Sequence, residues 1–134
     1  MIKQGDTYSH KVKFTQADVV KFAEVTGDFN PIHLDSEYAA KTIFKKPIVH
    51  GFLSGAVFSK VFGTLFPGEG TIYLSQEMKF LAPVFVEEQY EARFEVTEVN
   101  TEKHVGLVNC SLVNSQGAPA IVGVAKLKND AQFI

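Results

Sequence analysis

The sequence has a single cysteine, no clear excess of charge of either sign and no basic stripe. One cysteine excludes an internal disulfide, and Cys110 stands in a strand-like apolar run where a buried structural thiol is expected. The formal net charge is -2 at pH 7, so neither nucleic acid nor an anionic membrane is expected as a main partner.

Long hydrophobic runs are also missing. The most apolar stretch, Phe52 to Phe66, has about 15 residues, whereas a helix that spans a membrane needs about 20. A buried core helix is therefore the better interpretation of this stretch. The N-terminal run MIKQGDTYSH contains no apolar core, so we expect no secretion signal and a location in the cytoplasm or another reducing compartment.

What the sequence does contain is an ordinary globular composition. Its 134 residues are enough for one compact domain and too few for two, so residues 1-134 are expected to form a single domain. Apolar residues make up 46% and charged residues 21%, which argues against a disordered chain. No internal repeat, linker or low-complexity segment interrupts it.

The first half of the chain predicts a strand followed by a helix. Apolar and polar residues alternate from Tyr8 to Phe14, which favours a half-buried strand. Thr15 is expected to open the helix, because Asp18 completes an acidic variant of the capping box. Gly27 suits the position just past the helix end, where the left-handed conformation costs glycine little. A loop should follow, with a short helix over residues 36-41.

The second half predicts one helix and four strands. From Gly51 to Leu65 nearly every position is apolar, and a helix that is apolar all round must be buried on all sides. Strands are expected over residues 72-81, 90-97, 105-113 and 120-127. In the first of these strands, the alternation places Ile72, Leu74 and Met78 on one face.

One long apolar helix and an antiparallel sheet with one apolar face limit the architecture. Wrapping the sheet around the helix covers both apolar surfaces. The sequence therefore predicts an α+β chain with a single hot-dog fold, in which an antiparallel sheet surrounds a long central helix. One sheet alone would leave part of the helix and its own edge strands uncovered, so we expect a homodimer or an assembly of dimers.

The densest group of polar residues lies in the expected loop, Gly27-Asp28-Phe29-Asn30-Pro31-Ile32-His33. Pro31 stiffens this segment, and a turn could point the side chains of Asp28 and His33 at one small volume. A carboxylate and an imidazole that share a water can transfer protons, because the histidine pKa of about 6.5 is close to neutral pH. The structural alternative is that Asp28, Asn30 and Pro31 are turn residues and His33 is incidental.

The start of the apolar helix offers a second functional element. His50-Gly51 stands at its N-terminus, where unpaired N–H groups and a partial positive charge are presented. Glycine lets a ligand approach these amides, so a thioester carbonyl placed there would be polarised as in an oxyanion hole. The alternative is that Gly51 only relieves crowding where the helix enters the sheet.

These motifs carry a family resemblance. The run from Phe22 to Ala39, FAEVTGDFNPIHLDSEYA, resembles the hydratase-2 signature of (R)-specific enoyl-CoA hydratases, the MaoC-like family. The run from Pro47 to Gly51 and the polar Ser59 in the apolar helix also resemble its bacterial short-chain members. The likeness extends over most of the chain, and the motif is specific because its aspartate, asparagine, proline and histidine are spaced as a unit.

The resemblance implies a hot-dog homodimer that reversibly adds water, in syn fashion, to trans-2-enoyl-CoA to form (R)-3-hydroxyacyl-CoA. It implies that Asp28 and His33 activate the water that attacks C3 and deliver the proton to C2, while the Gly51 N–H holds the thioester oxygen. Asn30 would order the loop, and Ser59 would bind near the Asp28 carboxylate. Acyl-CoA is then the substrate, and no separate cofactor is expected because coenzyme A is part of the substrate.

Alternatives remain for the supporting residues. A lone serine in an apolar helix, such as Ser59, commonly hydrogen-bonds only to its own helix. His50, His33 and Asp28 could in principle bind a metal, but their spacing matches no common zinc pattern, and we expect no metal. His50 is interpreted instead as a supporting group at the helix start.

Two rival functions are weighed against hydration. Thioester hydrolysis can occur on the same fold, although hot-dog thioesterases usually use a lone carboxylate rather than an Asp-x-Asn-Pro-x-His unit. A non-catalytic acyl-thioester binding module would be favoured if Asp28 or His33 were missing, and both are present.

Overall fold

The computed structural model describes residues 1-134 and contains one five-stranded antiparallel sheet with the strand order β1-β3-β4-β5-β2. The strands are β1 (Thr7–Val12), β2 (Ile72–Phe80), β3 (Tyr90–Asn100), β4 (Val105–Asn114) and β5 (Pro119–Lys128). The helices are α1 (Gln16–Thr26), α2 (Pro31–Leu34), α3 (Ser36–Ala40) and α4 (Gly51–Thr64).

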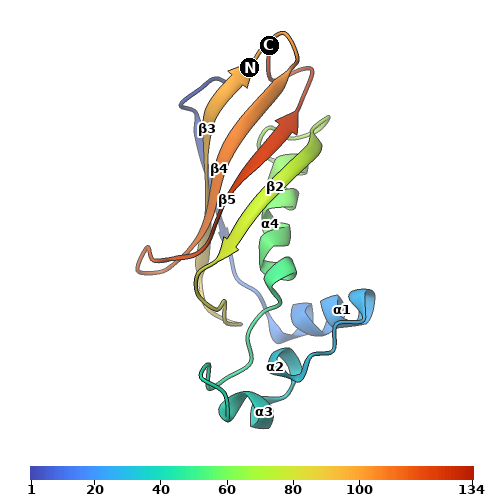
Figure 1. Ribbon diagram of the computed structural model, residues 1–134, viewed down its shortest axis with the longest axis vertical. Helices are drawn as coiled ribbons and strands as arrows, with labels where there is room; N and C mark the ends of the chain where they lie inside the picture. The colour runs from blue at the N-terminus through green and yellow to red at the C-terminus, as the bar shows by residue number, and fades with distance from the viewer.

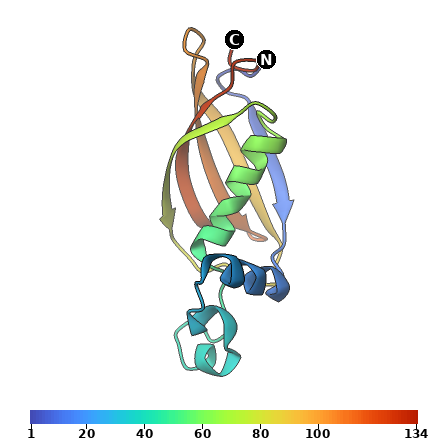
Figure 2. The same ribbon diagram turned by 90° about the vertical axis from the view of Figure 1, so that its right-hand side faces the viewer.

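The sheet curves around α4, which lies along its concave side (Figures 1 and 2). The contact surface is aromatic: the ring of Phe94 on β3 packs edge-on against those of Phe58 and Phe62, with centroids 5.8 and 5.2 Å apart. Both phenylalanines of the helix are almost fully buried. The predicted α+β hot-dog architecture is confirmed.

Local capping explains where α1 begins and ends. The Thr15 side chain accepts a hydrogen bond from the Asp18 N–H at 3.1 Å, and the Asp18 carboxylate accepts one from the Thr15 N–H at 3.0 Å. Gly27 follows the last turn with φ 78°, and its N–H donates to the Ala23 carbonyl. The predicted capping box and glycine stop are therefore confirmed.

The segment from α1 to α3 lies beyond one end of the sheet, below the start of α4 (Figure 1). It contains a short helix, α2, where the sequence predicts a loop. Pro31 occupies the first turn of α2, and the Asn30 side chain caps it by accepting a hydrogen bond from the Ile32 N–H at 3.2 Å. Four residues are too few to show a hydrophobic period, so the pattern of apolar residues does not reveal this helix. The local features that start it are the Asn30 cap and Pro31.

One expectation for α4 is wrong within a single chain: the helix is not buried on all sides. Phe52 is 73% exposed, and Ala56 and Ser59, which follow on the same side, are exposed too. The reason is that one curved sheet covers only the side of the helix that faces it. No helix in the structure combines the length and the apolar character needed to cross a bilayer.

A second correction concerns β2. Its pairing with β5 slips between Tyr73 and Ser75, which leaves Leu74 as an extra residue in the strand. This bulge turns the Tyr73 ring toward the core, 5.4 Å from that of Phe62. Ile72 and Leu74, predicted to share a face with Met78, are consequently exposed.

Candidate active site

Three ionisable side chains meet at the start of α4: Asp28 from the loop between α1 and α2, His33 from α2, and His50 from the residue before α4. Ligand-capable atoms of Asp28, His33 and His50 all lie within 4.8 Å of one another. The loop is held by short-range hydrogen bonds: the Asp28 N–H donates to Thr26 Oγ1 at 3.2 Å, and the Asn30 N–H donates to Asp28 Oδ1 at 3.3 Å. The structure therefore brings Asp28 and His33 together, as the motif suggested.

His33 lies on α2 and is 9% exposed. Its Nδ1 atom is 2.8 Å from the carbonyl oxygen of Ile48, and because a carbonyl only accepts, Nδ1 carries the proton. The other ring nitrogen, Nε2, is then left with a lone pair. Burial lowers the pKa of His33 below its usual 6.5, and the nearby His50 lowers it further, against opposing effects from the Ile48 carbonyl and Asp28. His33 is therefore a neutral acceptor at neutral pH.

His50 precedes the first residue of α4 and is 2% exposed. Its Nε2 atom donates to the main-chain carbonyl of Asp28 at 3.0 Å. Its ring stacks on that of His33, with centroids 3.9 Å apart and an interplanar angle of 30°. The ring of Phe22, from α1, covers another side at 4.8 Å. The residue thus joins α1, the Asp28 loop and α4.

The first N–H groups of α4 are free to receive a ligand. No side chain caps the helix, and its first internal main-chain bond is donated by Ser54, to the His50 carbonyl at 3.0 Å. The N–H groups of Gly51, Phe52 and Leu53 are thus without an acceptor within the protein. These N–H groups carry the partial positive charge of the helix N-terminus, which favours an anionic oxygen nearby.

Gly51 also has a packing role. A Cβ added at this position would lie 2.9 Å from Cε1 of Phe80, the last residue of β2. The close approach to Phe80 supports the crowding alternative for the glycine, and this alternative is compatible with the predicted oxyanion role. The Phe80 side chain is half exposed, so its ring is the part that can yield.

Two cavities meet at Gly51 and Phe80. One, of about 300 Å³, is lined by Asp28 and His50 and by Phe52 at the start of α4. The other, of about 380 Å³, contains His33 and is otherwise largely apolar. Asp28 and His33 therefore border neighbouring cavities that share Gly51 as a wall.

Asp28, His33 and His50 are also the set of side chains that could hold a metal ion. The lone pair of an imidazole lies in the plane of its ring, so two rings stacked 3.9 Å apart direct their lone pairs side by side rather than at one point. One nitrogen of each ring donates to a main-chain carbonyl, which leaves each ring with a single lone pair on its other nitrogen. This arrangement suits hydrogen bonding to a small polar molecule better than metal coordination.

Ser59 lies apart from this cluster in the single chain. It is exposed and lines a groove of about 390 Å³ between α4 and β2, together with Gly55 and Ser75. Its hydroxyl makes no hydrogen bond to Asp28, so the contact implied by the resemblance is not formed within one chain. The serine that meets the helix start is Ser54, whose hydroxyl donates to the Gly51 carbonyl at 2.8 Å.

Several residues that support the site are not predicted by the sequence. Ile48 orients His33 through its main-chain carbonyl, and Gln16 holds α2 by donating from Nε2 to the His33 carbonyl at 3.1 Å. Main-chain contacts of this kind leave no mark on residue type, so no sequence signal could have revealed them. Phe80 could have been suspected only as the apolar end of a strand.

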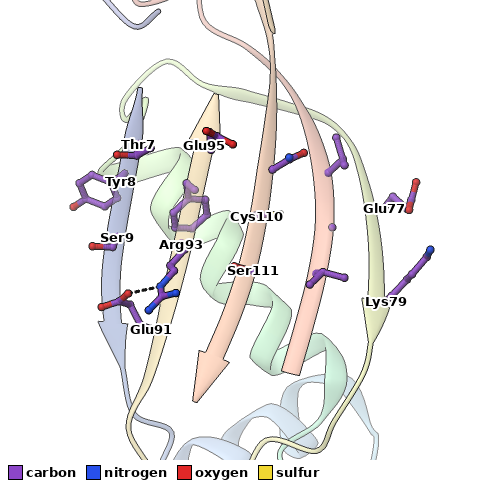
Figure 3. A pocket seen from close by; sticks show the side chains of 15 residues that line it. Thr7, Tyr8, Ser9, Glu77, Lys79, Glu91, Arg93, Glu95, Cys110 and Ser111 are labelled. Carbon is purple, nitrogen blue, oxygen red and sulfur yellow. Dashed lines mark hydrogen bonds and ion pairs between the residues drawn. The ribbon is translucent and has the colours of Figure 1, made fainter. Parts of the chain in front are cut away.

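A larger hollow, of about 980 Å³, lies on the opposite face of the sheet, with α4 behind it (Figure 3). It is lined mainly by polar and charged residues, among them Glu91 and Arg93, which form an ion pair at 2.6 Å. Cys110, on β4, also borders the hollow, but its thiol is buried within the sheet. Burial raises the pKa of this thiol to about 11. Neither Asp28 nor His33 borders this hollow.

The curved sheet around one helix, with a carboxylate and an imidazole beside the helix start, is the hot-dog architecture of acyl-thioester enzymes. The family model described as "MaoC like domain" matches residues 2–116, and the chain belongs to this family. The (R)-specific enoyl-CoA hydratase of Aeromonas caviae is 41% identical over 116 residues, which cover 87% of each chain. The 3-hydroxybutyryl-CoA dehydratase of Methylorubrum extorquens is 40% identical over 110 residues, or 82% of this chain and 70% of that one.

The structural comparison agrees. The solved structure of the A. caviae (R)-hydratase involved in PHA biosynthesis superposes with a TM-score of 0.92 at 38% identity, over 96% of this chain and 97% of the other.

Proposed function

We propose that this chain catalyses the (R)-specific, reversible addition of water to trans-2-enoyl-CoA, the activity for which its relatives are named. The observation that carries the proposal is the meeting of Asp28 and His33 beside the free N–H of Gly51. Conjugate addition of water requires two elements: a pair of groups that accepts a proton from the water, and a hydrogen-bond donor for the thioester oxygen.

The step begins with a water held between the Asp28 carboxylate and the Nε2 lone pair of His33. One water proton passes to this pair as the oxygen forms a bond to C3, and the C2=C3 electron pair moves toward the carbonyl. The negative charge that develops on the thioester oxygen is stabilised by the Gly51 N–H. The pair then returns the proton to C2, so that both parts of the water add from one face. The step involves no oxidation or reduction.

The structure of the site favours hydration over its rivals. A thioesterase needs no acceptor besides its carboxylate, whereas here Ile48 orients His33 so that its second nitrogen faces the site as a base. A simple binding module would not require a buried imidazole with a lowered pKa. These features support catalysis by the pair.

Incubation with crotonyl-CoA separates the three possibilities. A hydratase removes the absorbance of the enoyl thioester and leaves the thioester bond intact. A thioesterase releases a free thiol, which a thiol reagent detects, and a binding module does neither. Because hydrolysis also destroys the conjugated thioester, the release of thiol is what separates the two enzymes. Thiol released in step with the loss of absorbance, or no loss of absorbance at all, would overturn the proposal.

We further propose that two copies associate along β2 and the open side of α4. Exposed apolar side chains gather here: Phe52, Ile72, Tyr73, Leu74, Phe80 and Leu81. β2 is an edge strand with unpaired main-chain groups and no lysine before Lys79, while the other edge, β1, carries the lysine and hydroxyl side chains that protect an edge. A second copy would cover both the strand and the helix.

This interface bears on two supporting residues. Ser59 lies in the groove between α4 and β2, so any contact with Asp28 would have to be made between subunits. Asn30 acts within the chain: its side chain caps α2 and thereby orders the segment between Asp28 and His33. We propose that Asn30 supports the loop rather than touching substrate.

The proposed reaction needs no cofactor apart from the coenzyme A of the substrate, since hydration moves a proton and a hydroxyl group without oxidation or reduction. The unpaired, buried Cys110 suits a reducing compartment such as the cytoplasm, where we expect the reaction to take place.

A further inference from the structure

His50 contains an unsatisfied polar atom in the interior of the protein. The residue is 2% exposed, and its Nδ1 has no hydrogen-bond partner. Because Nε2 donates to the Asp28 carbonyl, Nδ1 carries a lone pair. This lone pair is buried away from solvent and accepts no hydrogen bond from the protein. An unsatisfied buried acceptor destabilises the folded protein, so packing alone does not explain a histidine here.

The remaining atoms of His50 are engaged with the two side chains of the proposed reaction. The Nε2–H holds the main-chain carbonyl of Asp28 at 3.0 Å, and the ring lies against His33. The Asp28 carboxylate lies on an exposed loop, and its one hydrogen bond within the protein is accepted from the Asn30 N–H of the same loop at 3.3 Å. The contact from His50 is therefore the one that ties Asp28 to the rigid start of α4.

We propose that His50 is a positioning residue that sets the distance between Asp28 and His33 for the hydration reaction. The inference rests on the proposed function, since it concerns the alignment of that pair. His50 acts by hydrogen-bonding the Asp28 main chain from one edge of its ring while its face supports the His33 imidazole. It touches no reacting atom. Nδ1 stays unpartnered because only the opposite ring edge can reach the loop.

A purely structural role makes a different prediction. Phenylalanine is a flat aromatic side chain somewhat larger than histidine, could stack on both His33 and Phe22, and has no polar side-chain atom. It removes the donor to the Asp28 carbonyl, which lies on an exposed loop where water can replace that donor. If His50 served only packing, His50→Phe would be as stable as the parent or more stable, and equally active. If His50 positions Asp28, the same variant would keep or gain stability and lose turnover.

The test compares His50→Phe with His50→Gln by thermal unfolding and by steady-state hydration of crotonyl-CoA. Gln places an N–H₂ group near the position of Nε2, so it restores the donor without the ring. We expect His50→Phe to melt no lower than the parent and to lose about tenfold to a hundredfold in kcat, with KM little changed, because small misplacements of catalytic groups cost about that much. His50→Gln should recover a large part of kcat.

Parental kcat in folded His50→Phe, or a loss that His50→Gln does not relieve, would overturn the inference. If His50→Phe does not fold, His50→Leu, which is smaller and also lacks the donor, provides the same comparison with His50→Gln. A failure of the proposed function looks different, because then the parent protein itself would not hydrate crotonyl-CoA.

Discussion

The Nδ1 atom of His33 donates to the carbonyl oxygen of Ile48 at 2.8 Å. This bond determines which ring nitrogen carries the proton and directs Nε2, with its lone pair, toward the volume shared with Asp28. The chemistry proposed for the site depends on this neutral form, and a testable pH dependence follows from it.

The protein should lose hydratase activity only when the solution becomes mildly acidic. Protonation of His33 removes the lone pair that accepts the water proton, and burial places its pKa below the usual value of 6.5. We expect kcat/KM for crotonyl-CoA to be level near pH 7 and to fall on acidification below about pH 6.5, the unperturbed histidine value. A rate profile from pH 5 to pH 8 checks this, and an acid limb centred above pH 7 would contradict it.

The same shift has a consequence for stability. A histidine with a lowered pKa binds its proton at a higher pH in the unfolded chain than in the folded one, so the free energy of unfolding falls as the pH drops below about 6.5. His33→Gln should make this fall smaller in urea titrations at pH 7.5 and 5.5. His10→Gln should also make the fall smaller, because burial lowers the pKa of His10, on β1 away from the site, in the same direction.

Asp28→Asn should abolish most turnover and leave the fold intact. Asparagine keeps the side-chain oxygen that accepts from the Asn30 N–H, but it cannot take a proton from water. Loss of one proton-transfer group costs about a hundredfold to ten-thousandfold in rate. The measurement is kcat with crotonyl-CoA, after circular dichroism has established that the variant is folded.

Asp35→Asn serves as the matched control, since Asp35 caps α3 by accepting from the Glu37 N–H at 3.0 Å and asparagine caps helices equally well. It should retain parental kcat. His33→Ala should resemble Asp28→Asn, and the two losses should not multiply in the double variant, because both groups act on one water. Independent, multiplying losses would argue against a shared water.

Gly51→Pro and Gly51→Ala form a pair that isolates the main-chain donor. Both add a Cβ that meets the Phe80 ring, 2.9 Å away, and only proline removes the N–H. Proline is tolerated in the first turn of a helix, which is where Gly51 lies. We expect kcat of Gly51→Pro to be lower than that of Gly51→Ala by about a hundredfold to a thousandfold, the effect of losing one oxyanion donor. Equal kcat in the two folded variants would show that the oxyanion is held elsewhere.

A charge on the β2 edge should separate the subunits. Leu74 is 45% exposed at the bulge of this strand, in the groove beside α4. Leu74→Glu would place a carboxylate in an apolar interface, so we expect sedimentation velocity to show monomer where the parent sediments as a dimer. Val124→Glu introduces the same charge on the outer face of the neighbouring strand β5, at a site 39% exposed, and should leave the dimer intact. A parent protein that is monomeric at micromolar concentration would contradict the proposed association.

The sequence by itself determined the features that depend on near neighbours along the chain. The capping box of Thr15 and Asp18 and the left-handed Gly27 each involve residues within one helical turn, so residue type was a sufficient guide. The long apolar helix and the alternation of β3 were equally readable, because their periods repeat over many residues. The Asp-x-Asn-Pro-x-His unit likewise identified the candidate catalytic pair.

Only the tertiary structure decided what depends on groups far apart in the sequence. The proton position on His33 is set by a carbonyl fifteen positions away, and the support of Asp28 by His50 spans 22 positions. The bulge at Leu74 and the open side of α4 result from how one curved sheet meets one helix. Main-chain atoms, which are chemically alike at every residue, make the decisive contacts at the site, so their partners are selected by the fold and leave no trace in residue type.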